Sequence, residues 1–282
     1  MRNWPAGLLL RKFCFSPLAA LAGRREPVRF RRFSIMLMTA AVAIAPAAAL
    51  AEPTDITVRV ISLGGKFIGS TMGGARIILR DAQSGEILAE GRTEGTTGDT
   101  ARIMTGGPRN IAVADGKTAA FHARIDIDEP RLVEVEAYGP LAQPQSAMRV
   151  TARQWVLPGR GVTAGDGWVL EMPGLVVDMV EPAAHRRGQA GKAVRVAVNV
   201  ALMCGCPIEP GGLWDAARFD VRATVRLDGR KVAELPLPYA GHTGYFAADL
   251  KLDRPGGYVI TVAAVDGRTG ATGVDRSSIL IR

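Results

Sequence analysis

Residues 193–207 read Ala193-Val-Arg-Val-Ala-Val-Asn-Val-Ala-Leu202 followed by Met203-Cys-Gly-Cys-Pro207. Large apolar side chains occupy every second position, and Ala, Arg or Asn stand between them. A period of two residues is typical of a β-strand that turns one face toward a core. The stretch therefore predicts a strand whose apolar phase continues to Cys204.

Runs of similar character recur from residue 56 onward, separated by Gly, Pro, Asp and Asn. In the first half they cover residues 56–69, 75–80, 87–91, 119–127, 132–138 and 148–157. In the second half they cover residues 175–180, 193–203, 219–227, 231–236, 245–252, 258–265 and 273–281. Long runs with helical apolar spacing do not occur. This pattern predicts an all-β protein with two consecutive β-sandwich, immunoglobulin-like domains.

Glycine and proline divide the chain further. Residues 158–167, Pro-Gly-Arg-Gly-Val-Thr-Ala-Gly-Asp-Gly, have the composition of a linker. We therefore expect a leader over residues 1–51, a first sandwich over 52–157, this linker, and a second sandwich over 168–282.

Two local patterns resemble known modules. The turn Asp81-Ala-Gln-Ser-Gly-Glu86 and its flanking runs resemble transthyretin-like or carboxypeptidase-regulatory-like modules. The second half resembles a bacterial immunoglobulin-like domain, although it lacks the inter-sheet cysteine pair and a clear core tryptophan. Both resemblances imply a sandwich fold, and they imply little about activity.

The first 51 residues have the order of parts of an export signal. Arg29, Arg31 and Arg32 precede an apolar run over residues 35–50, and Ala49-Leu-Ala51 has the small residues of a cleavage site. The run is short for a membrane span, which needs about 20 residues. We expect cleavage after Ala51, a periplasmic or secreted mature protein, and no membrane span after cleavage. A retained anchor is the alternative.

The leader also carries most of the net charge. It holds eight of the 35 Lys and Arg residues and one of the 27 acidic residues, so the net charge falls from +8 to +1 beyond it. A surface that neutralises nucleic-acid phosphates needs clustered positive charge. This charge balance argues against a nucleic-acid partner. Sequence patterns of a serine hydrolase or a metalloprotease are missing, so we do not expect an enzyme.

The motif Met203-Cys-Gly-Cys-Pro207 carries the only distinctive chemistry. Side chains two residues apart on an extended strand are about 6.8 Å apart, too far for a disulfide, whose Cβ atoms lie about 4 Å apart. Gly205 and Pro207 predict a bend that could bring the two sulfur atoms together. The motif is then a Cys204–Cys206 disulfide or a pair of buried thiols, a metal site, or a thiol–disulfide redox or attachment site.

A metal site would use soft ligands. Met203, Cys204, Cys206 and His242 form the candidate set, and such ligands select Cu(I), or Zn(II) where thiolate and imidazole dominate. His122 lies on the polar phase of a strand and His185 in a turn, so both are expected at the surface.

The function favoured by the sequence is that of an exported, non-catalytic accessory protein of the bacterial envelope, which binds another envelope protein. A periplasmic copper-binding protein is the alternative. A thiol–disulfide redox partner is the second alternative.

Overall fold

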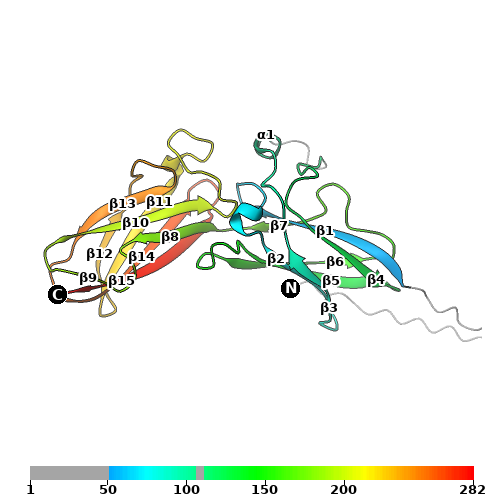
Figure 1. Ribbon diagram of the computed structural model, residues 1–282, viewed down its shortest axis with the longest axis horizontal. Helices are drawn as coiled ribbons and strands as arrows, with labels where there is room; N and C mark the ends of the chain where they lie inside the picture. The colour runs from blue at the N-terminus through cyan, green and yellow to red at the C-terminus, as the bar shows by residue number, and fades with distance from the viewer. Residues whose placement is uncertain (1–50, 106–110) are drawn as a thin grey trace, which may run out of the picture. The chain divides into compact units, whose positions relative to one another are not determined.

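The computed structural model describes residues 51–105 and 111–282, which form four β-sheets (Figure 1). Each predicted strand run contains a strand, but the run over residues 56–69 is a strand only as far as Ser62 and continues as a loop; the all-β sandwich class is confirmed. The short helical elements of this part are η1 (Ser70–Met72), α1 (Thr100–Met104) and η2 (Ala216–Arg218). No helix in these two ranges is long and apolar enough to cross a membrane. The predicted signal peptide lies outside the described residues except for Ala51, and it stays a prediction.

The first sandwich pairs a three-stranded sheet with a four-stranded sheet. The first sheet has the order β4 (Phe121–Ile127), β1 (Glu52–Ser62), β7 (Trp168–Met172). The second has the order β3 (Ile87–Arg92), β2 (Arg76–Asp81), β5 (Arg131–Gly139), β6 (Met148–Val156). Alternate residues of the central strands form the core, including Ile56, Val58 and Val60 of β1.

The second sandwich pairs a three-stranded sheet with a five-stranded sheet. The smaller sheet has the order β13 (Tyr245–Lys251), β10 (Ala193–Leu202), β8 (Leu175–Glu181). The larger has the order β12 (Arg230–Pro236), β11 (Phe219–Leu227), β14 (Gly256–Asp266), β15 (Thr272–Ile281), β9 (Arg186–Gly188). The valines of β10 and Leu202 point into this core as their period of two predicts.

Strand pairing changes the assignment of residues 158–172. Val162 pairs with Ile56, and β7 runs parallel to β1, from Val58 opposite Trp168 to Ser62 opposite Met172. The sequence predicts a linker over 158–167 and places 168–172 in the second domain. Both segments lie instead on the first sandwich, because they complete the hydrogen bonding of β1. The first strand of the second sandwich, β8, begins three residues after β7, at Leu175. The division into two domains otherwise stays a prediction.

The expectation of no core tryptophan was also wrong. Trp214 is buried in the core of the second sandwich, and Trp168 is buried in the core of the first. Trp214 lies in the loop before η2, and Trp168 is the first residue of β7.

Candidate functional site

A tight turn after β10 brings the two cysteines of the motif together. The amide of Gly205 donates a hydrogen bond to the carbonyl oxygen of Leu202 at 2.8 Å. Gly205 has a φ of +73°, and a Cβ atom at this position would lie 2.7 Å from Sδ of Met72. Both conditions favour glycine. The turn leaves the Cα atoms of Cys204 and Cys206 5.4 Å apart, and the two residues form a disulfide.

The disulfide lies in the core of the second sandwich and against the loop after β1 of the first. Cys204 and Cys206 are each only 2% exposed. The amide of Lys66 donates a hydrogen bond to Sγ of Cys204 at 3.4 Å. A Cβ atom on Gly65 would lie 2.9 Å from the same sulfur. The approach of this loop to the disulfide therefore depends on a residue without a side chain.

A second contact joins the same loop to the second sandwich. Nε1 of Trp214 donates a hydrogen bond to the carbonyl oxygen of Gly64 at 2.9 Å. Gly64 has a φ of +66°, and Cγ2 of Thr269 packs against it. We call the loop of residues 63–66 together with the Cys204–Cys206 disulfide and Trp214 the disulfide junction. It links two sandwich cores through contacts between residues about 140 to 150 positions apart in sequence.

A buried ion pair beside the disulfide junction joins Arg218, the last residue of η2, to Asp266, the last residue of β14. Nη2 of Arg218 lies 2.6 Å from Oδ2 of Asp266, whose side chain is 1% exposed. Oγ1 of Thr269 and the amide of Arg268 also donate hydrogen bonds to this carboxylate. Burial alone would raise the pKa of Asp266, but the hydrogen bonds and the guanidinium charge hold that pKa below its ordinary value. The carboxylate therefore fixes the turn that carries Thr269.

The structure does not bring the four predicted metal ligands together. Met203 is fully buried in the core of the first sandwich, where its Cε atom packs against Gly174. The cysteines lie in the other core and bond to each other. His242 is exposed and stacks on Tyr245, with 4.1 Å between ring centroids. In residues 51–105 and 111–282, no group of three or more His, Cys, Asp or Glu side chains could hold a metal ion.

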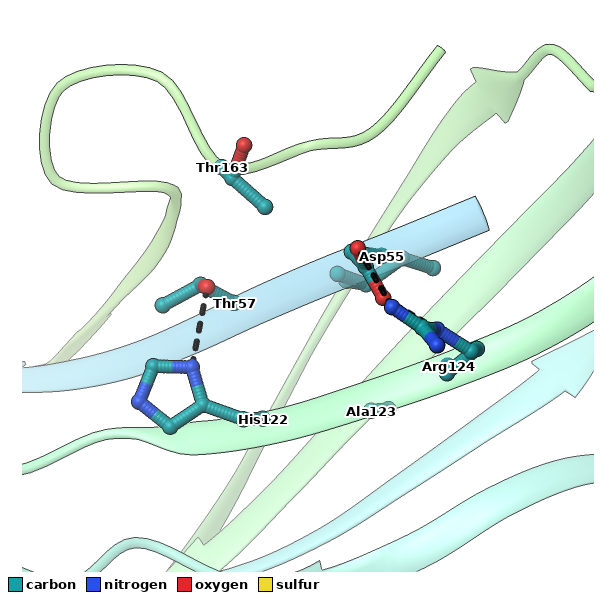
Figure 2. Close-up of a pocket in the computed structure, with 7 residues that line it drawn as sticks. Asp55, Thr57, His122, Ala123, Arg124 and Thr163 are labelled. Carbon is teal, nitrogen blue, oxygen red and sulfur yellow. Dashed lines mark hydrogen bonds and ion pairs between the residues drawn. The ribbon is translucent and has the colours of Figure 1, made fainter. Parts of the chain in front are cut away.

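An open hollow on the outer face of the β4–β1 pair has a volume of about 480 Å³ (Figure 2). Arg124 donates two hydrogen bonds to Asp55, at 2.8 and 3.2 Å, and these lower the pKa of that carboxyl. His122, expected at the surface, is exposed, and its Nδ1 atom is hydrogen-bonded to Oγ1 of Thr57 at 3.1 Å. Because Asp55 pairs with Arg124 and not with His122, these side chains do not form the hydroxyl–imidazole–carboxylate relay of a hydrolase.

Comparison with known proteins leaves the family open. No family model matches the chain, and no curated protein matches it. An engineered protein of known structure is similar over 45% of this chain and 24% of its own length, with 21% identity and a TM-score of 0.30. Fibronectin(III)-like modules of Clostridium thermocellum CbhA are similar over 82% of this chain and 94% of theirs, with 10% identity and a TM-score of 0.27. The chicken interferon gamma receptor alpha chain is similar over 83% and 98%, with 9% identity and a TM-score of 0.30. Similarities this weak carry no inference about function, and the two module resemblances stay predictions.

The residues that contact the cysteines and their loop, Lys66 and Trp214, are not predictable from the sequence. Lys66 contributes a backbone amide, and Trp214 stands in a loop. Neither contact has a sequence signature, because each depends on how two distant loops meet.

Proposed function

We propose that the protein is an exported, non-catalytic binding protein of the bacterial envelope, whose two sandwiches are joined at the disulfide junction into one scaffold. The observation that carries this proposal is the position of Cys204 and Cys206. Both sulfur atoms are buried, bonded to each other and packed against the loop of residues 63–66. The disulfide then stabilises the fold, and a partner protein is bound by the surfaces of the sheets.

The burial of the sulfur atoms argues against the two alternatives. A thiol–disulfide exchange needs an attacking thiolate to reach one sulfur along the bond axis, so a redox-active disulfide is exposed on at least one side. A copper site needs free thiolates and further soft ligands within bonding distance. Met203 is in the other sandwich core, and His242 is stacked on Tyr245 at the surface.

The proposal is tested by cross-linking the tagged full-length chain in intact cells and purifying it under denaturing conditions. A parallel sample, purified without cross-linking, is analysed for copper and zinc. We expect a discrete cross-linked envelope protein. Its yield should fall when untagged protein is added to permeabilised cells and competes for the partner. The sample without cross-linking should contain less than about 0.1 copper or zinc ion per chain, that is, about one occupied site in ten chains. One copper or zinc ion per chain without any cross-linked protein would contradict the proposal.

A further inference from the structure

The outer face of the five-stranded sheet carries a groove with a volume of about 490 Å³. It lies where β14, β15 and the start of β9 run side by side. Its lining includes His185, Arg187, Gly257, Val259, Ser278 and Leu280.

Gly257 keeps the groove open. Its φ lies outside the left-handed region, so its backbone does not require glycine, and no heavy atom lies within 4 Å of the position that a Cβ atom would take. Glycine in a strand is less favourable than alanine, because it loses more backbone freedom on folding. Neither backbone geometry nor packing explains this glycine. A strand glycine often marks a bulge, a bend or a place where a ligand or another chain approaches the backbone, and Gly257 leaves room for such an approach.

One side of the groove is apolar and exposed. Val259 and Leu280 are 44% and 40% exposed, and Leu280 is the cross-strand partner of Gly257. Val265 and Val274, further along the same two strands, are also exposed. The Thr261–Arg276 pair separates these two valines from Val259 and Leu280, so the apolar patch at the groove is formed by Val259 and Leu280.

The other side of the groove is basic. The backbone amide of His185 donates to the carbonyl oxygen of Ser278 at 2.9 Å, and its Nδ1 atom is hydrogen-bonded to Oγ of Ser278 at 2.9 Å. His185 has a φ of 62°, which is uncommon for a residue other than glycine. Arg187 is exposed and lies opposite Leu280 in the parallel β9–β15 pair. The residues that line the groove include this guanidinium and this imidazole, and none of them is a carboxylate.

We propose that the groove binds the C-terminal carboxylate of a partner polypeptide that ends in a hydrophobic residue such as Leu or Val. Arg187 donates to the carboxylate, with the His185 ring beside it, and the terminal side chain lies over Gly257 between Val259 and Leu280. A guanidinium matches a carboxylate through two parallel hydrogen bonds. The groove is open on its outer side, so it covers one face of a ligand. A ligand covered on one face only fits the end of a polypeptide chain in a larger partner protein. The folded part of that partner would then cover Val265 and Val274. The inference rests on the proposed binding function and names a ligand for it.

The test is a titration of the mature chain with a hexapeptide that ends in a free Leu carboxylate, followed by amide chemical shifts. The same peptide with a C-terminal amide, and octanoate, are titrated in parallel. We expect shifts centred on Gly257 and Leu280 with the free carboxylate and an affinity at least about tenfold lower for the amide, because a charge-assisted pair is lost. Equal affinity for both peptides would overturn the proposal. Octanoate binding as tightly as the peptide would overturn the choice of a polypeptide.

Two variants test the geometry. Gly257→Leu fills the groove without a clash, and Arg187→Gln removes the charge from an exposed position. Each is expected to lower the affinity at least about tenfold, whereas Thr261→Leu, which adds similar bulk on the same face of β14, leaves it unchanged. Unchanged binding by folded Gly257→Leu and Arg187→Gln would overturn the proposal. If Gly257→Leu still yields the cross-linked envelope protein in cells while the wild type binds no peptide, the binding function stands and only this groove assignment fails.

Discussion

Nε1 of Trp214 donates a hydrogen bond at 2.9 Å to the carbonyl oxygen of Gly64, a residue of the other sandwich. The indole ring is buried in the core of the second sandwich, so this bond fixes a loop of the first sandwich to a rigid part of the second. With the bond from the Lys66 amide to Cys204, it makes the loop of residues 63–66 a shared element of both halves.

Replacing Trp214 with Phe removes this hydrogen bond and keeps most of the ring. The free energy of unfolding should fall by about 1–2 kcal/mol, because a partly buried carbonyl oxygen loses its donor. Urea unfolding followed by circular dichroism measures the change. Trp155→Phe is the matched control, since Trp155 is 59% exposed, and its effect should stay within about 0.5 kcal/mol. Equal effects of the two substitutions would show that the bond to Gly64 contributes nothing.

Gly65→Ala should destabilise the protein by about 1–3 kcal/mol, because the added methyl group meets Sγ of Cys204 and Cδ2 of Leu202 in a packed core. Gly116→Ala is its control. A Cβ atom on Gly116 meets nothing within 4 Å, and its φ is outside the left-handed region, so this change should be neutral or stabilise by up to about 1 kcal/mol. Thermal unfolding of both variants distinguishes them. A stable Gly65→Ala protein would mean that the loop does not pack closely on the disulfide.

The strands were predictable from the sequence because each carries a local period. β11 was expected over 219–227 and is found there. β7 and β9 were missed because they have five and three residues and pair in parallel with distant β1 and β15. Such pairing leaves no local pattern.

The candidate site was predictable only in part. Alternation along β10 puts Met203 on the face opposite to Cys204, which already separates the two residues. That this face enters the core of the first sandwich, where Met203 packs against Gly174, is set by the tertiary structure and has no local pattern. The turn that joins the cysteines was expected from Gly205, but the partners Lys66 and Trp214 depend on the tertiary structure.

Acid should weaken the protein through Asp266. The folded state lowers the pKa of this carboxyl below its ordinary value near 3.8, so the group stabilises the fold above that value, and this contribution is lost as the pH falls through the lowered pKa. Asp266→Asn should reduce the free energy of unfolding at pH 7 by about 3 kcal/mol, because Arg218 loses its buried partner. Below pH 4 the difference from the wild type should shrink. Asp128→Asn, at an exposed site, should change neither value. A pH-independent difference between wild type and Asp266→Asn would contradict the ion-pair account.

Processing of the leader gives an independent check on export. If the signal is cleaved after Ala51, N-terminal sequencing of the mature protein should read Glu52-Pro53-Thr54. Strand β1 begins at Glu52, so the cleavage removes no residue of the sandwich. Recovery of the protein with residues 1–51 still attached would favour the retained anchor.

In the proposed function Cys204 and Cys206 form a structural disulfide and serve neither as metal ligands nor as redox thiols. The most direct measurement is the intact mass of the mature protein after it is unfolded in a denaturant that contains a thiol-reactive maleimide and no reductant. We expect no adduct without reductant and two adducts after reduction, since Cys204 and Cys206 are the two cysteines that remain once the leader with Cys14 is removed. Two adducts without reductant, on protein purified from an oxidising compartment, would show free thiols and contradict the account.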